Sequence, residues 1–212
     1  MILTQVRNSL EEHPPKASIF GVGGSPRKNG NSDVLLEQIL NGARANEVPA
    51  TGIHLRDIQF SGCIGCEKCR KDRICTGLVD VMSVLYPEVH QAMGLVLVSP
   101  THNYNITSWM KAFIDRLYCF YTFADTRPRA WSSRLAGQGR KAVLAAICEQ
   151  EHQADMGFTL EAMRLPLKAL GYEIVGELPV FSVFERGKVK DNEDALASAK
   201  RLGEELALSL GQ

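Results

Sequence analysis

Short apolar runs alternate with helical patterns along the whole chain. The runs at 93–99 and 141–148 are nearly continuous, which is typical of strands buried on both faces of a parallel sheet. Elsewhere apolar residues recur at helical spacing, as at Leu35 and Ile39. We predict strands at 17–22, 51–55, 93–99, 141–148 and 172–184, and helices at 31–45, 80–89, 107–120, 155–170 and 193–210. Pro87 is expected to kink or break the second of these helices.

Five strands, each followed by a helix, predict an α/β fold in a single domain, 1–212. An open five-stranded parallel sheet with helices on both faces satisfies the preference for right-handed crossovers. Ligands of such sheets bind beyond the carboxyl ends of the strands, where the strand order reverses. The loops after Val22, Ser99 and Ile147 are therefore the predicted binding region. Three segments fall outside the regular pattern: an N-terminal arm at 1–15, a cysteine-rich loop at 61–78 and a long irregular segment at 121–140.

Charge and hydropathy narrow the class of partner. The chain has 24 basic and 24 acidic residues, so its formal net charge at pH 7 is zero. This balance gives no electrostatic case for binding nucleic acid or an anionic membrane. No stretch approaches the roughly 20 apolar residues that cross a bilayer. Residues 1–15 have no apolar run of signal-peptide length, and we expect a cytoplasmic protein.

The loop after the first predicted strand has the composition of a phosphate site. Its glycines allow backbone N–H groups to approach an anion closely, and it opens onto the start of a helix, where free N–H groups favour phosphate. It adds neutral donors and positive charges: Ser25, Asn29, Asn31, Ser32, Arg27 and Lys28. Neither the Walker loop nor the dinucleotide fingerprint is present. We therefore predict that it binds a monophosphate.

Four of the six cysteines lie within thirteen residues: Cys63, Cys66, Cys69 and Cys75. In a reducing compartment such thiols stay free, bind metal or carry out redox chemistry. Their spacing is compact enough for a 4Fe–4S cluster. A structural zinc ion, a redox-sensing dithiol and free thiols without metal are the alternatives. Neighbouring lysines and arginines are expected to lower the pKa of the thiols and to offset the charge of a cluster.

Residues 24–32 resemble the phosphate loop of the NADPH-dependent FMN reductase branch of the flavodoxin superfamily. Residues 100–106 and 110–116 resemble the second flavin loop of that family and the helix after it. The resemblance implies a flavodoxin-like fold that binds FMN. It assigns the phosphate to Ser25, Arg27, Asn29, Asn31 and Ser32, and the flavin ring to Pro100, Thr101, His102, Asn103, Tyr104, Asn105 and Ile106. His102 stands where relatives often have Tyr or Glu.

The cysteine pattern, followed by Val79-Asp80-Val81-Met82, resembles the iron–sulfur flavoproteins of the same superfamily. Val81 stands where relatives often have a second acidic residue. The resemblance implies a 4Fe–4S cluster on the four cysteines that relays single electrons to FMN, usually across a subunit interface. It further implies a homodimer or homotetramer, a ferredoxin-like electron donor, and a small-molecule acceptor such as a quinone or oxygen.

Two other functions remain open at this point. One is a cluster-free NAD(P)H-dependent FMN or quinone reductase, in which NAD(P)H delivers hydride directly to the flavin. The other is a thiol redox sensor. For flavin chemistry the cofactor carries out the reaction while the protein binds and orients it. No protein acid or base is required, and we assign no catalytic residue.

Overall fold

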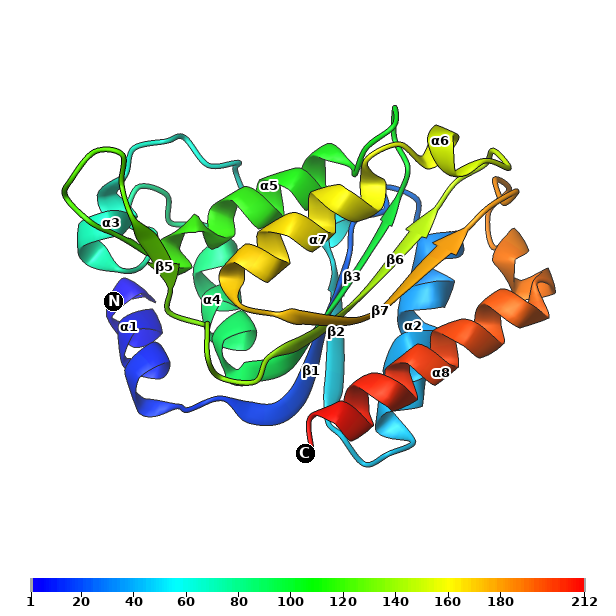
Figure 1. Cartoon of the computed structure of the whole chain (residues 1–212), viewed down its shortest axis with the longest axis horizontal. Coiled ribbons are helices and arrows are strands. Elements are labelled where there is room, and N and C mark those ends of the chain that lie inside the picture. Colours follow the sequence, from blue (N-terminus) through cyan, green and yellow to red (C-terminus); the bar gives the residue numbers. More distant parts are fainter. Residues whose placement is uncertain (1, 212) are drawn as a thin grey trace.

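The computed structural model describes residues 2–211 and contains the expected five-stranded parallel sheet (Figure 1). Its strands are β1 (Lys16–Gly23), β2 (Ala50–His54), β3 (Ala92–Pro100), β6 (Lys141–Ile147) and β7 (Glu173–Val180). They run in the order β2-β1-β3-β6-β7, with every neighbouring pair parallel. This is the flavodoxin-like order, and the chain reverses direction across the sheet between β1 and β3.

Helices cover both faces of the sheet (Figure 1). One face carries α2 (Asn31–Arg44) and α8 (Glu193–Ser209), and the other carries α4 (Met82–Gln91), α5 (Ser108–Arg116) and α7 (Thr159–Leu170). Successive residues of β3 are buried on opposite faces: Val96 and Val98 contact the core under α2 and α8, whereas Leu95 and Leu97 contact the other core. This double burial explains the continuous apolar run in the sequence.

The N-terminal arm contains a helix that the sequence analysis missed, α1 (Ile2–Glu12), which packs against α4. Its apolar residues Leu3, Val6 and Leu10 recur at helical spacing and pack against the core, so the signal was present in the sequence. Pro87 lies inside α4, so the helix is not broken there. Burial of Tyr86 and Val89 on either side of the proline holds the helix to the core despite the missing N–H donor.

Two expected helices are each divided in the structure. The helix expected at 107–120 is α5 followed by the 3-10 turn η2 (Leu117–Phe120). The helix expected at 155–170 is α6 (Gln153–Met156) and then α7, separated at Gly157. Gly157 has a φ of +57°, and a Cβ there would lie 2.3 Å from the carbonyl oxygen of Tyr104. The break therefore brings α7 close to the loop after β3.

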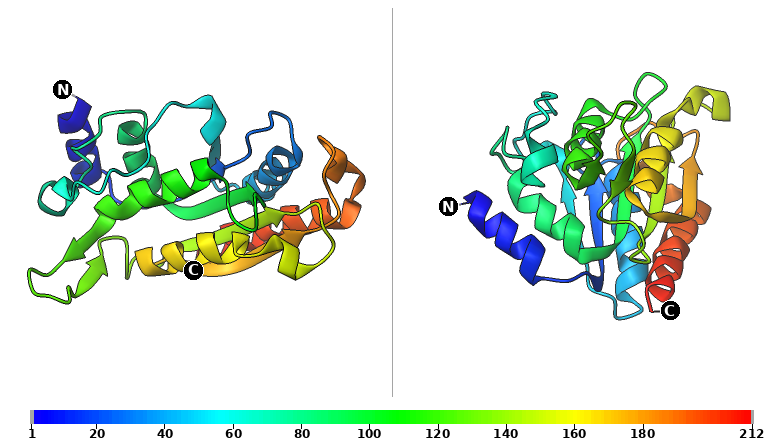
Figure 2. Two further views of the ribbon diagram at one scale, coloured as in Figure 1. Left: turned by 90° about the horizontal axis from the view of Figure 1, so that it is seen from above. Right: turned by 60° about the vertical axis from the view of Figure 1, so that its left-hand side comes forward.

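The segment 121–140 contains an antiparallel hairpin of two short strands, β4 (Tyr121–Phe123) and β5 (Trp131–Ser133). Figure 2 shows this hairpin at the end of the molecule that also holds α1 and the short helix α3 (Lys68–Asp72). Three-residue strands are too short for an alternating pattern to be recognised in the sequence.

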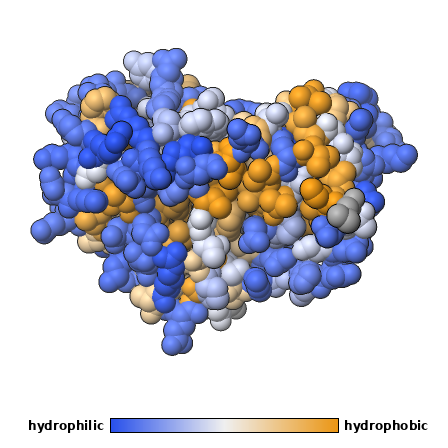
Figure 3. All heavy atoms as spheres, turned by 180° about the vertical axis from the view of Figure 1, so that it is seen from behind, coloured by the Kyte–Doolittle hydropathy of each residue, from blue (hydrophilic) through white to orange (hydrophobic). Residues whose placement is uncertain are grey.

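Some large apolar side chains remain on the surface. The face opposite the view of Figure 1 carries a band of apolar surface between hydrophilic areas (Figure 3). Ile64, Val79 and Val84, from the cysteine-rich segment and α4, are each more than half exposed. Within residues 2–211, none of the helices combines the length and the apolar character needed to pass through a membrane.

Candidate flavin and cysteine sites

The predicted phosphate loop connects β1 to α2; its two ends are buried, whereas residues 26–29 between them are exposed. Ser25 is 4% exposed and Ser32 is 2% exposed, and the Ser25 hydroxyl accepts a hydrogen bond from the N–H of Arg27 at 3.2 Å. Gly30 precedes α2, and within residues 2–211 no side chain caps this helix. The N–H groups of its first turn therefore remain available to an anion.

An ion pair that the sequence analysis missed, between Arg56 and Asp33, holds this loop in place. Arg56, from the turn η1 (Leu55–Asp57) after β2, donates to both carboxylate oxygens of Asp33 at 2.8 Å. The same guanidinium donates to the carbonyls of Ser25 at 3.2 Å and Arg27 at 3.4 Å. Asp33 also accepts the N–H of Asn29 at 2.7 Å. Arg56 thus fixes the loop and neutralises a carboxylate that would repel a phosphate.

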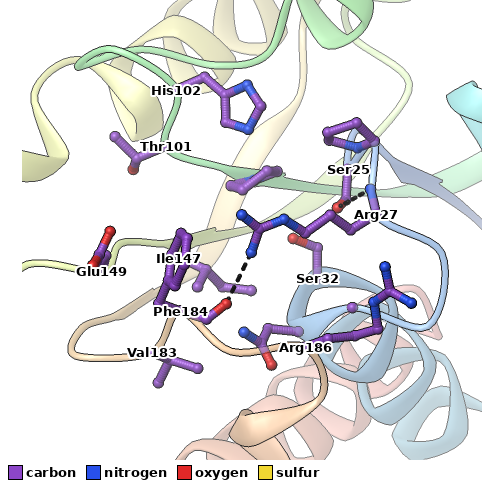
Figure 4. A pocket seen from close by; sticks show the side chains of 14 residues that line it. Ser25, Arg27, Ser32, Thr101, His102, Ile147, Glu149, Val183, Phe184 and Arg186 are labelled. Atoms are coloured by element: carbon purple, nitrogen blue, oxygen red, sulfur yellow. Dashed lines mark hydrogen bonds between the residues drawn. The ribbon is translucent and has the colours of Figure 1, made fainter.

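Four loops at the carboxyl ends of the strands line one cavity beside the phosphate loop (Figure 4). Besides Ser25, Arg27 and Ser32, its lining includes Pro26, Gly30, Asn31, Pro100, Thr101, His102, Ile147, Glu149, Val183, Phe184 and Arg186. The loops after Val22, Ser99 and Ile147 therefore meet where the sequence predicts. The loop after β7, which brings Phe184 and Arg186, was not predicted.

The predicted phosphate residues do not all face this cavity in the same way. Asn29 lines a different cavity, on the α2 and β2 side of the loop. Asn31 lines the phosphate cavity, but its amide is bound elsewhere: it donates to the carbonyl of Glu185 at 2.9 Å and accepts the N–H of Val189 at 3.1 Å. Its side chain therefore joins the phosphate loop to the segment after β7.

The second predicted flavin loop forms a tight turn. His102 and Asn105 exchange backbone hydrogen bonds of 2.8 and 3.1 Å, and Asn103 and Tyr104 between them both have positive φ, +50° and +65°. This conformation is costly for a tyrosine. The N–H of Phe158 donates to the Tyr104 carbonyl at 2.8 Å and helps to hold it. Pro100, Thr101 and His102 line the cavity, whereas the turn itself lies outside its lining.

A buried hydroxyl fixes the two loops relative to each other. Thr107 donates to the carbonyl of Gly24 at 2.8 Å and accepts the N–H of Met110 at 3.2 Å, so it links the phosphate loop to the first turn of α5. Ser99 accepts the N–H of Thr107 at 3.3 Å. The strand ends and α5 therefore form a rigid frame around the cavity.

The four clustered cysteines line a second cavity, near α3 and the carboxyl end of α5. Burial, and after it the charges of the Cys75, Cys63 and Cys66 thiols, raises the pKa of the Cys69 thiol to about 11. The expectation that basic neighbours lower the thiol pKa is therefore wrong for Cys69. Within residues 2–211, the side chains of His, Cys, Asp and Glu do not converge closely enough to surround a single metal ion.

Gly77 and Arg70 are the neighbours of the clustered cysteines that bear on what the segment can bind. A Cβ on Gly77 would lie 2.4 Å from the sulfur of Cys66, so glycine leaves the room that this thiol occupies. Arg70 donates to the hydroxyl of Tyr118 at 2.7 and 3.2 Å and lies 4.5 Å above the ring of Phe123. Its Nη1 is buried and has no partner among residues 2–211.

A buried ion pair closes the base of the cysteine segment. Arg116, 2% exposed, donates to Asp80 at 2.7 and 3.0 Å and to the carbonyl of Ser61 at 2.7 Å. Burial opposes the ionisation of Asp80, but hydrogen bonds from Arg116, Ser61 and Met82 outweigh it and hold the pKa of Asp80 below its ordinary value. Asp80 also accepts the N–H of Met82 at 3.1 Å, but its main partner is Arg116.

The model of the NADPH-dependent FMN reductase family matches residues 17–165, which include both flavin loops and all four clustered cysteines. The chain belongs to this family. The match confirms the expected class, an FMN-dependent oxidoreductase. Two archaeal relatives place it in the iron–sulfur flavoprotein subgroup of the NADPH-dependent FMN reductase family.

Both relatives are named iron–sulfur flavoproteins. The one from Methanocaldococcus jannaschii is 25% identical over 194 residues, which cover 89% of this chain and 95% of the relative. The one from Archaeoglobus fulgidus is 30% identical over 189 residues, covering 88% and 77%. An FMN-dependent NADH-azoreductase from Bacillus anthracis, solved in complex with FMN, has a TM-score of 0.65 at 16% identity, covering 93% of this chain and 100% of that one. This similarity shows that the chain and the azoreductase share the same fold.

Proposed function

We propose that this FMN-dependent oxidoreductase is an electron-transfer flavoprotein that binds FMN and holds a 4Fe–4S cluster on Cys63, Cys66, Cys69 and Cys75. The observation that carries the proposal is that four thiols line one cavity in a chain of the FMN reductase family. Single-electron exchange between such a cluster and FMN would join one-electron donors to two-electron acceptors.

The residues around the first cavity suit the phosphate of FMN. The hydroxyls of Ser25 and Ser32, the guanidinium of Arg27 and the free N–H groups at the start of α2 would hold it. Asn29 and Asn31 would act through their backbone and through the shape of the loop. When bound, FMN would supply a ring that accepts two electrons and releases them singly. Pro100 to Ile106 would lie against that ring, with His102 at the cavity.

The second cavity suits a cluster better than a single ion. In a 4Fe–4S cluster each cysteine binds its own iron, so the thiols stand further apart than the four ligands of a zinc ion. The space beside Gly77 and the unpartnered Nη1 of Arg70 are features that sulfur ligands of a charged cluster can use. When bound, the cluster would relay single electrons.

We propose a homodimer or homotetramer with a ferredoxin-like donor and a small-molecule acceptor such as a quinone or oxygen. The exposed apolar side chains of Ile64, in the cysteine-rich segment, and Val79, directly after it, favour an intersubunit contact there. If the cysteines hold no cluster, NAD(P)H would be the reductant instead.

The test is anaerobic purification, with a visible spectrum and assays of iron and acid-labile sulfide on the same sample. We expect the bands of oxidised flavin, a broad shoulder bleached by dithionite, and about four irons per chain. Cys69→Ser should lose the iron and keep FMN, whereas Cys148→Ala, which removes a buried thiol outside the cluster set, should keep both. Flavin without iron would favour the NAD(P)H-dependent reductase. Failure to take up FMN would overturn the proposal.

A further inference from the structure

The loop after β7 contributes a positive charge to the FMN cavity that the phosphate loop does not account for. Arg186 lines this cavity together with Arg27, although the two residues are far apart in the sequence. Arg186 lies beyond residue 165, where the match to the family model ends. Of the side chains that line the cavity, Glu149 is the one that carries a carboxylate. The cavity therefore has a cationic lining.

These two arginines are exposed, and they differ in their partners from three other arginines near the sites. Arg44, Arg56 and Arg116 each pair with a carboxylate within 4.0 Å. Within residues 2–211, neither Arg27 nor Arg186 has such a partner. Two unpaired guanidinium groups beside an uncapped helix start are an arrangement that a dianionic phosphate would complete.

Contacts across the cavity fix the loop in this position (Figure 4). Arg27 donates to the carbonyl of Phe184 at 3.0 Å, and its guanidinium lies 4.4 Å above the ring of Phe184. The amide of Asn31 holds the same loop through Glu185 and Val189. The loop is also joined to the loop after β6, because the N–H of Val183 donates to the carbonyl of Cys148 at 3.3 Å. Arg186 is therefore carried on a segment anchored on both sides of the cavity.

We infer that Arg186 is a phosphate-binding residue that, together with Arg27, makes this site select phosphorylated flavin over riboflavin. The inference rests on the proposed FMN site and adds to it a residue from the loop after β7. Arg27 has five N–H donors, of which the Phe184 carbonyl uses one, so further donors remain for a phosphate. Phe184 acts as a positioning residue, because its carbonyl and its ring both contact the guanidinium of Arg27.

The test compares FMN with riboflavin, which lacks the phosphate, by measuring both dissociation constants by fluorescence quenching. Arg186→Ala should weaken FMN about tenfold, the loss of one charge-assisted hydrogen bond, and change riboflavin less than about twofold. Raising the salt concentration should narrow the difference between wild type and variant for FMN. Arg186→Lys should recover part of the affinity, because a lysine keeps the charge but not the planar fork.

Lys190→Ala is the matched control. It removes the same charge from the same segment, but Lys190 lines the cavity on the other side of the phosphate loop. If Lys190→Ala and Arg186→Ala weaken FMN binding equally, the effect comes from the net charge of the segment and not from a contact of Arg186. That result would overturn the inference. Equal wild-type affinity for FMN and riboflavin would also overturn it, while leaving the flavoprotein proposal intact. If the wild type binds neither flavin, both fail.

Discussion

The phosphate cavity and the cysteine cavity lie at two ends of the same helix, α5, but the structure holds them in different ways. Around the phosphate cavity the binding groups themselves are fixed: Ser25 and Ser32 are buried, and Thr107 bonds the loop to α5. In the cysteine segment the Arg116–Asp80 pair fixes the ends, while Cys63 and Cys66 are exposed and Cys69 and Cys75 are half-buried.

This difference follows from the chemistry of the two ligands. A phosphate is recognised by N–H donors whose directions must be set before it arrives, so the fold itself builds the site. A cluster forms strong bonds to thiolates and can order the chain that carries them, as metal ligands do in many small sites. Anchored ends and exposed thiols are then sufficient. Each of the following substitutions is expected to affect one cavity and leave the other unchanged.

The largest effect is expected from Asp80→Asn, which removes the charge opposite the buried Arg116. Leaving a buried charge unpaired costs about 3 kcal/mol of unfolding free energy at pH 7. The pKa of Asp80 in the folded protein lies below its ordinary value of 3.8, so the wild-type advantage is complete above 3.8 and is lost as the pH falls through the lower folded value. Urea unfolding at pH 7, 5 and 3 measures this difference.

Asp191→Asn is the control for this experiment, since Asp191 pairs with Lys188 at an exposed site. Surface pairs contribute about 0.5 kcal/mol, so this variant should stay close to the wild type at every pH. Asp80→Asn should also reduce iron content and leave FMN affinity unchanged. If FMN affinity falls with stability, the two cavities are not independent and the comparison fails.

The next effect, on the phosphate cavity alone, is expected from Arg56→Lys. A lysine has no planar fork and cannot bond Asp33 and the carbonyls of Ser25 and Arg27 together. The loop should lose its fixed shape, and FMN should bind about tenfold more weakly, equivalent to about 1.4 kcal/mol. Arg44→Lys, the same change at a site paired with Glu37 further along α2, should leave FMN binding unchanged. Equal losses in both variants would contradict the assigned role of Arg56.

The sheet, its two faces and both cavities follow from sequence patterns, because buried parallel strands produce long apolar runs and glycine-rich or cysteine-rich loops carry their chemistry in consecutive residues. Arg186 and Phe184 do not follow in this way. Phe184 meets Arg27 across 157 positions of sequence, and nothing local marks that contact. The position of Arg186 just after the last strand was an available signal, since every strand of such a sheet ends at the same edge.

Buried charges explain most of the other omissions. Arg56 and Arg116 look like ordinary surface residues in the sequence, because their partners Asp33 and Asp80 are 23 and 36 positions away. Burial also reverses the expected direction of the Cys69 pKa, since loss of hydration and the nearby thiols both disfavour the thiolate. Local composition therefore predicts which groups are present, while the fold decides which of them are paired and which are free.

The smallest effect on stability, and the most specific test of the cysteine cavity, is expected from Gly77→Ala. The new methyl group would fall 2.4 Å from the sulfur of Cys66, which sits at the end of a short exposed side chain and can move aside. Unfolding free energy should change by less than about 1 kcal/mol, the range of a glycine-to-alanine substitution in a loop. Iron content should nevertheless fall, because one ligand is displaced. Gly62→Ala, whose Cβ meets nothing closer than Ala112 at 3.8 Å, should retain its iron. Equal iron content in both variants would mean that the position of the Cys66 thiol does not matter, and that the cavity seen here is not the one that holds the cluster.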